Sequence, residues 1–154
     1  MLLREATLAD VAGLVDVQQA GAQLALAHIF PQSQHPFPRA AISARWAAEV
    51  ASPDVDVLVV GRDPIEAFAA MRSDELLHFG TAVSTWGTGL AGEVHAELIE
   101  RFVAAGHPSA WLRVFEQNHR ARRFYEKMGW SATERRSRSP FAPHPVLVEY
   151  RIGL

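Results

Sequence analysis

The sequence predicts a mixed α/β fold in which a mostly antiparallel sheet contains one parallel pair of strands. A strand, a glycine-containing loop, a helix and a second strand follow one another across residues 75–115. This order requires a parallel pair joined by a right-handed crossover. Two apolar runs before it are separated by Arg62-Asp63-Pro64. A turn of that kind joins antiparallel neighbours, so the sheet is expected to be mixed.

The composition predicts one domain spanning residues 1–154. With 154 residues and 49% hydrophobic content, the chain is long enough to bury a core of its own. A net charge of −2 gives no argument for a nucleic-acid partner, and the absence of cysteine excludes disulfides and thiolate nucleophiles. Neither a signal peptide nor a membrane span is expected, so no membrane partner is predicted and the cytoplasm is the expected location.

The first half of the chain alternates short strands with amphipathic helices. Thr7 followed by Asp10 resembles a capping box, which marks the start of a helix. Proline and aromatic residues after Ala27 argue against a continued helix. The predicted elements are a strand at 1–5, a helix from Leu8 toward Leu26, a loop at 28–38, a helix at 40–50, and strands at 56–60 and 65–71.

The second half carries the parallel pair and a final pair of strands. Leu90, Val94, Leu98 and Phe102 recur at helical spacing directly after the glycine-containing loop. Gly106 and Gly129 are placed as helix ends. The predicted elements are a strand at 75–82, a helix from Leu90 to near Gly106, a strand at 110–115, a helix capped by Asn118, and strands at 131–137 and 146–152.

The loop Trp86-Gly-Thr-Gly-Leu-Ala91 is predicted to bind a pyrophosphate. Unpaired amides at a helix start point outward, and the helix dipole favours negative charge. A P-loop is excluded because the only lysine, Lys127, is followed by Met128. Gly87-x-Gly89-x-x-Gly92 also satisfies the glycine spacing of dinucleotide binding, with Glu116 as the acid. However, too little sequence follows this loop for a doubly wound sheet.

A second motif lies at residues 118–130, and the two motifs together resemble the GNAT superfamily of acyl-CoA-dependent N-acyltransferases. The family's loop pattern, Gln/Arg-x-x-Gly-x-Gly/Ala, is matched from Trp86 to Ala91 with tryptophan in first place. Its second pattern, Asn-x-x-Ala-x-x-Phe-Tyr-x-x-x-Gly-Phe, is matched from Asn118 to Trp130 with tryptophan in last place. The order and the separation of the motifs fit, and with the flanking elements the resemblance covers essentially the whole chain.

The resemblance implies a GNAT-like sheet with two splayed central parallel strands, helices on both faces, and coenzyme A entering between those strands. Here the two strands are 75–82 and 110–115. Phe79, Gly80 and Thr81 are expected to pair with the pantetheine arm, while Gly80 is also compatible with a bulge. An amide near them is a candidate to stabilise the oxyanion. The pyrophosphate is expected to lie on the amides of Trp86, Gly87, Thr88, Gly89, Leu90, Ala91 and Gly92.

The resemblance also implies catalytic roles. Tyr125 matches the acid that protonates the departing thiolate. Glu75 is a candidate general base, and His78 is the second candidate; by alternation they face opposite ways unless a bulge intervenes. Asn118 is expected to cap its helix and to contact the cofactor. Of Arg120, Arg122 and Arg123 near the cofactor mouth, one is expected to meet the nucleotide phosphate, and Arg122 is the one assigned. Because Trp86 and Thr88 replace the family's usual polar or basic residues in the loop, phosphate binding is expected to rest more on backbone amides than on side-chain charge.

Two functions therefore stay open after the sequence. The first is an acetyl-CoA-dependent N-acetyltransferase that acts on a small-molecule or peptide amine by direct transfer, with no metal. The alternative is a non-catalytic acyl-CoA-binding module of the same fold, motivated by the departures at Trp86 and Thr88. The acceptor is not identified by the sequence. His28, His35, Phe37 and Trp46 fall in the region that shapes the acceptor pocket in the family, where dimers are also common.

Overall fold

A computed structural model describes residues 1–154 and contains one seven-stranded sheet in the order β1-β2-β3-β4-β5-β7-β6. Only β4 and β5 run parallel, and all other neighbours are antiparallel. The mixed sheet that the sequence predicts is therefore confirmed. The strands are β1 (Arg4–Glu5), β2 (Asp56–Gly61), β3 (Ile65–Arg72), β4 (Glu75–Thr81), β5 (Ser109–Phe115), β6 (Ser131–Arg138) and β7 (Val146–Gly153).

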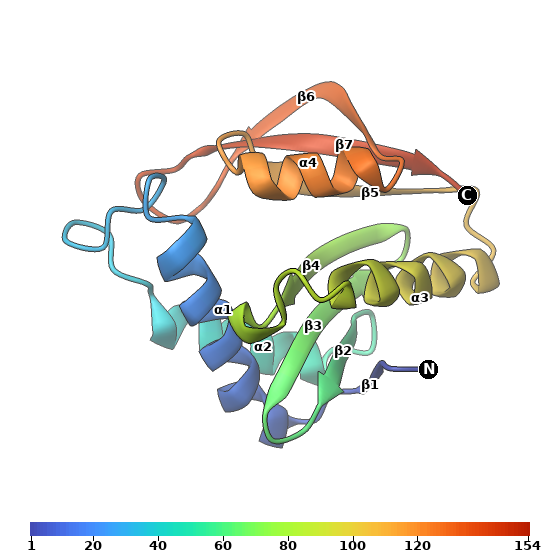
Figure 1. Ribbon diagram of the computed structural model, residues 1–154, viewed down its shortest axis with the longest axis horizontal. Coiled ribbons are helices and arrows are strands. Elements are labelled where there is room, and N and C mark those ends of the chain that lie inside the picture. Colours follow the sequence, from blue (N-terminus) through green and yellow to red (C-terminus); the bar gives the residue numbers. More distant parts are fainter.

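Helices cover both faces of the sheet, and each face has its own apolar core. Helices α3 (Leu90–Ala104) and α4 (His119–Lys127) bury Val94, Leu98, Phe102 and Tyr125 against one face. Helices α1 (Val11–Ala25) and α2 (Arg39–Ala51) bury a second cluster, centred on Trp46, against the other face. In Figure 1, α3 and α4 lie in front of the strands and α2 lies behind them. None of the helices combines the length and apolar composition that a membrane span requires.

The start of the first helix follows the predicted capping pattern. The Thr7 amide donates to the Asp10 carboxylate at 2.8 Å, and a short 3-10 turn at Leu8–Asp10 leads into α1. The Arg4 guanidinium donates twice to the same carboxylate, at 2.8 and 3.0 Å. These bonds hold the pKa of Asp10 at about 2, below its ordinary value. Asp10 is therefore a buried anchor that ties β1 to α1.

Replacing Asp10 with asparagine is expected to lower the free energy of unfolding by about 1–2 kcal/mol at pH 7, since one pKa unit corresponds to about 1.4 kcal/mol. A depressed folded-state pKa stabilises the protein above the unfolded value, so the difference from wild type is lost as pH falls from about 4 toward 2. Chemical denaturation across pH measures it. Asp16→Asn is the control, because its ion pair with Arg39 is exposed and contributes less. Equal losses in both variants would contradict the anchoring role.

The parallel strands β4 and β5 separate after a short paired segment. Their register contains two pairs, Glu75 with Trp111 and Leu76 with Leu112. Beyond Leu76, β4 has no partner on that edge, and Figure 1 shows the two strands diverging from there. The splayed central pair that the family resemblance implies is thus present. The open edge of β4 is where backbone groups are free to meet a ligand.

Strand β4 contains a bulge, which determines the face of the sheet from which Glu75 and His78 project. Met71 pairs with Leu76 and Ala70 pairs with His78, so Leu77 is the extra residue. The expectation of a bulge at Gly80 is wrong. Gly80 lies three residues after the bulge and pairs regularly with Phe68 of β3. Alternation of side chains restarts at the bulge. Consequently Glu75 and His78 project from the same face of the sheet, the face covered by α2, rather than from opposite faces.

Gly80 is a glycine because an aromatic ring occupies the space above it. A Cβ atom there would lie 2.5 Å from Cζ of Phe68, whose ring packs edge-on against Trp46 at 5.5 Å and has little room to move. Gly80→Ala is therefore expected to cost about 1–3 kcal/mol through overpacking. Thermal unfolding tests this against Gly21→Ala, a position inside α1 with ordinary space, where alanine is expected to be neutral or stabilising. A neutral Gly80→Ala would show that the ring adjusts freely.

Candidate functional site

The loop between β4 and α3 presents a set of unpaired backbone donors. The amides of Gly87, Gly89, Ala91 and Gly92 donate to no atom of the protein, whereas those of Trp86 and Thr88 close local turns. Gly87 and Gly89 have φ values of +81° and +90°, which favour glycine. A Cβ at either position would meet nothing within 4 Å. The loop is therefore open to solvent, with its free amides at the positive end of a 15-residue helix.

Trp86 contacts both the end of β4 and the start of α4. Its indole N–H donates to the Thr81 carbonyl at the end of β4 (3.2 Å), and the Arg120 guanidinium stacks on its ring, 3.4 Å from the centroid. Arg120 belongs to the first turn of α4, beyond the end of β5. Burial against the ring lowers the pKa of Arg120 without removing its charge at neutral pH. Tryptophan thus holds a cation beside a loop that has no basic side chain of its own.

The free edge of β4 offers further backbone groups. The Ala82 amide donates to the Glu66 carbonyl of β3 at 2.8 Å. By antiparallel alternation the Gly80 amide also faces β3, and those of Phe79 and Thr81 face the gap. Of the three residues predicted to pair with a pantetheine arm, Phe79 and Thr81 therefore turn backbone groups toward the gap. Gly80 does not.

Tyr125 combines a buried ring with an unpaired hydroxyl. Its ring packs against Phe124, Trp130 and Tyr150, and 8% of the residue is exposed. The hydroxyl has no hydrogen-bond partner, yet it is not among the polar atoms sealed from solvent. Burial raises the pKa of Tyr125, so the phenol keeps its proton at neutral pH. An unbonded phenol of this kind is free to donate its proton to a ligand.

The remaining residues of α4 have clear partners. The Asn118 side chain accepts a hydrogen bond from the Ala121 amide (3.2 Å), which confirms the predicted cap. Arg122 donates to the Tyr150 hydroxyl (2.8 Å) and to the Glu116 carbonyl (2.9 Å), and the first of these bonds raises its pKa. Arg122 is thus engaged with β7 and the end of β5. Arg120, rather than Arg122, lies against the predicted phosphate loop.

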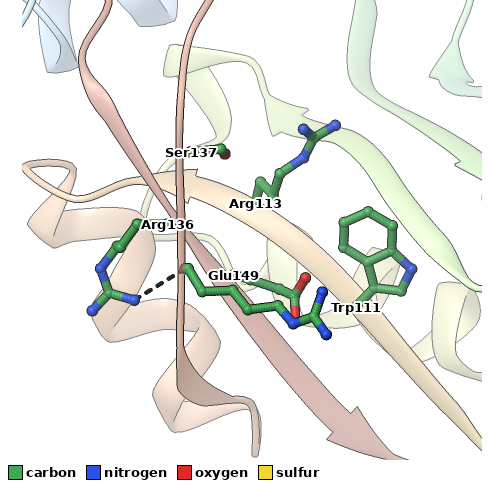
Figure 2. Close-up of a pocket in the computed structure, with 6 residues that line it drawn as sticks. Trp111, Arg113, Arg136, Ser137 and Glu149 are labelled. Carbon is green, nitrogen blue, oxygen red and sulfur yellow. Dashed lines mark hydrogen bonds and ion pairs between the residues drawn. The ribbon is translucent and has the colours of Figure 1, made fainter.

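Glu75 is enclosed by arginines at the closed end of the split. It is 3% exposed, and its two oxygens accept from Arg72 (2.9 Å) and Arg113 (3.3 Å). Arg113 also lines a cavity of about 220 Å³ on the uncovered face of β5, β6 and β7. Figure 2 shows its guanidinium pointing away from Glu149, the one acid of that cavity. With both oxygens in ion pairs, Glu75 is poorly placed to act as a general base.

His78 lies where β4 has already left β5. Its Nε2 atom is 3.0 Å from Oε1 of Glu49 in α2, and its ring packs against Trp46 with centroids 4.7 Å apart. The sequence placed His78 beside the gap but gave no sign of Glu49. No pattern in one sequence tells which residue of α2 meets which residue of β4. No three His, Asp or Glu residues gather closely enough to hold a metal ion.

The chain is thus an α/β protein whose mixed sheet splits between β4 and β5, beside a helix start with unpaired backbone amides. Residues 58–130 match the model of the acetyltransferase (GNAT) family, a segment that includes the loop, Tyr125 and His78. This segment is thus similar to the acetyltransferase (GNAT) family, and the whole chain has the GNAT fold.

Solved structures with the same fold cover almost the whole chain. The PaiA N-acetyltransferase of Thermoplasma acidophilum in complex with coenzyme A has a TM-score of 0.76 at 15% identity, covering 99% of this chain and 98% of its own. A GCN5-related N-acetyltransferase of Rhodopseudomonas palustris has a TM-score of 0.78 at 16% identity, covering 99% and 94%. The ribosomal-protein-S18-alanine N-acetyltransferase of Escherichia coli has 0.69 at 16%, covering 98% and 92%. At these identities the similarity establishes the fold. No curated protein sequence matches the chain significantly.

The position of Arg120 leads to a direct prediction. Arg120→Gln is expected to weaken coenzyme A binding about three- to tenfold and to reduce its dependence on salt, because one cation near the phosphates is lost. Calorimetric titration at two salt concentrations measures both effects. Arg123→Gln is the control, since Arg123 is exposed on the same helix and has no ring beneath it. Equal effects at both positions would show that only the general charge of α4 matters.

Proposed function

We propose that the protein is an N-acetyltransferase that moves the acetyl group of acetyl-CoA directly to a primary amine. The observation that carries this proposal is the set of four unpaired amides at Gly87, Gly89, Ala91 and Gly92. They open to solvent at the mouth of the gap between β4 and β5. A diphosphate satisfies such donors, and the Arg120 cation adds a charge beside them.

Different residues along the gap are assigned to cofactor binding, oxyanion stabilisation and proton donation. Bound acetyl-CoA would supply an activated acyl group as a thioester. The backbone of Phe79 and the amide of Thr81 are available to orient the arm of the cofactor, and an amide turned into the gap is suited to stabilise the oxyanion that develops on the carbonyl. Tyr125 holds a proton on an unbonded hydroxyl, ready for the departing sulfur. Asn118 keeps its side-chain amide group for the cofactor while its oxygen caps α4.

Thiol release tests the proposal. Release of free coenzyme A is expected only when acetyl-CoA and an amine are both present, and the amine should recover the acetyl group in a one-to-one ratio by mass spectrometry. The coenzyme A complex in the Thermoplasma relative supports the choice of donor. Hydrolysis of acetyl-CoA at the same rate without any amine would contradict direct transfer.

The alternative of a non-catalytic acyl-CoA-binding module has one observation in its favour, the engagement of Glu75 with Arg72 and Arg113. It predicts saturable binding of acetyl-CoA with no thiol release on a broad panel of amines. The dinucleotide alternative, in contrast, requires a doubly wound parallel sheet. The observed sheet has one parallel pair, and the acid proposed for the ribose, Glu116, forms an ion pair with Arg136 at 3.5 Å.

A further inference from the structure

We propose that His78 is the general base of the transfer and that Glu49 of α2 is the residue that positions it. This assignment rests on the proposed acetyltransferase function. It replaces Glu75, which the sequence favoured, with a pair of residues brought together by tertiary structure. The proposal depends on which ring nitrogen of His78 is free, on which face of the gap it lies, and on what surrounds the pair.

The free nitrogen follows from the hydrogen bond to Glu49. A carboxylate only accepts hydrogen bonds, so in the neutral imidazole the 3.0 Å contact selects the tautomer with the hydrogen on Nε2 and the lone pair on Nδ1. Nδ1 has no partner in the protein and is not among the polar atoms sealed from solvent. A neutral imidazole with one nitrogen held and the other open is a competent proton acceptor.

The ring is held firmly in this orientation. Its neighbour Trp46 is fully buried and donates its indole N–H to Gln18 at 2.6 Å. The ring of His78 packs on this fixed surface, and the side chain of His78 is 18% exposed. Trp46 and the Glu49 carboxylate together fix the orientation of the imidazole, and Nδ1 stays accessible to solvent.

The base and the acid lie on opposite faces of the split. Tyr125 belongs to the core covered by α3 and α4, whereas His78 contacts Trp46 of the core covered by α1 and α2. His78 is also the second residue after the last β4–β5 pair, so it borders the gap. A thioester in the gap would therefore meet an acid from one face and an amine beside a base from the other, as direct attack requires.

Charged and neutral groups of α2, β3 and β4 surround His78. From α2 it faces Glu49 and, through Glu49, Arg45, whose Nε lies 3.7 Å from the carboxylate. On β4 the nearest acid is Glu75, whose charge Arg72 and Arg113 neutralise. On β3 the residue paired with His78 is Ala70, which carries no charge. Oε2 of Glu49 is buried without any hydrogen-bond donor. This underused carboxylate oxygen is available to stabilise an imidazolium.

The proton balance uses both side chains. Nδ1 of His78 takes one proton from the ammonium of the acceptor, and the freed nitrogen lone pair forms the C–N bond as the C–S bond breaks. Sulfur takes the proton of Tyr125, and the second proton that the nitrogen loses restores the phenol through solvent. One proton per turnover leaves through His78, so the overall products are the amide, free coenzyme A and one proton.

Three measurements test the assignment. In the ligand-free protein, long-range ¹H–¹⁵N correlation is expected to show the Nε2–H tautomer of His78. His78→Gln, which keeps a donor toward Glu49, should lower kcat about 10²–10⁴-fold and leave coenzyme A affinity unchanged. Glu49→Gln should move the acid limb of the kcat profile to lower pH by about one unit. His107→Asn, outside the gap, is the control and should change none of these.

The outcomes separate this inference from the proposed function. An Nδ1–H tautomer, or a His78→Gln variant with the wild-type kcat and pH profile, would overturn the assignment while leaving the acetyltransferase intact. A Glu49→Gln variant that loses stability with an unmoved acid limb would reduce Glu49 to a structural residue and overturn its positioning role. Absence of turnover in the wild type on every amine, with coenzyme A bound, would instead remove the proposed function.

Discussion

Replacing Tyr125 with phenylalanine is expected to lower kcat by about 10²–10⁴-fold, the usual contribution of a positioned general acid. The hydroxyl makes no hydrogen bond in the protein, so its removal leaves no buried partner unsatisfied. The unfolding temperature and the affinity for coenzyme A should therefore change little. Steady-state kinetics, thermal unfolding and calorimetry on one preparation measure all three quantities.

The only other tyrosine, Tyr150, provides the matched control. Its hydroxyl accepts a hydrogen bond from Arg122 and donates one to Glu126 at 3.1 Å. Tyr150→Phe therefore removes two structural hydrogen bonds and no proton donor of the reaction. The expected result is the reverse of that for Tyr125: a loss of about 1 kcal/mol of stability, with kcat largely kept. A Tyr125→Phe enzyme with full activity would contradict the acid assignment.

A carboxylate introduced at the start of α3 is expected to weaken coenzyme A binding without lowering the stability of the fold. Ala91 is the second residue of α3, where an acidic side chain suits the helix dipole and leaves stability unchanged or improved. The same carboxylate would oppose a diphosphate on the neighbouring amides. Ala91→Glu is therefore expected to raise the Kd for coenzyme A about 100-fold, equivalent to about 2.7 kcal/mol. Calorimetric titration at low salt measures this change.

Two variants of matched size control the loop experiment. Ala91→Gln has the shape of the glutamate without its charge, and should bind coenzyme A within a few-fold of wild type. Ala91→Lys should bind at least as tightly as wild type and more so at low salt. If Ala91→Glu and Ala91→Gln weakened binding equally, size rather than charge would govern the site, and the loop would not be a phosphate site.

The local pattern of the sequence was enough to predict the elements and the loop. Helical spacing from Leu90 to Phe102 and the capping residues Thr7 and Asn118 correctly located three helices, because these signals act within a few residues. The two motifs were enough to predict the split sheet, since together they imply the family. The open amides from Gly87 to Gly92 followed from the same short stretch.

The rest of the site depends on contacts between residues distant in sequence. The bulge at Leu77 shifts His78 onto the face of Glu75, and strict alternation cannot reveal it. Glu49 meets His78 because α2 covers the face of the sheet from which His78 projects. Glu75 is enclosed because Arg113 of β5 and Arg72 both bind its carboxylate. Likewise Arg120 rather than Arg122 reaches the loop, because Arg122 is drawn to Tyr150.

Backbone NMR during titration with coenzyme A tests the central claim most directly. The chain has ten glycines, whose amide signals form a resolved group, and three of them, Gly87, Gly89 and Gly92, lie in the loop or in the first turn of α3. Saturable downfield shifts of the amide protons of Gly87, Gly89, Ala91 and Gly92, all at one dissociation constant, are the predicted result. Saturable binding that leaves these four signals in place, or no binding at all, would contradict it.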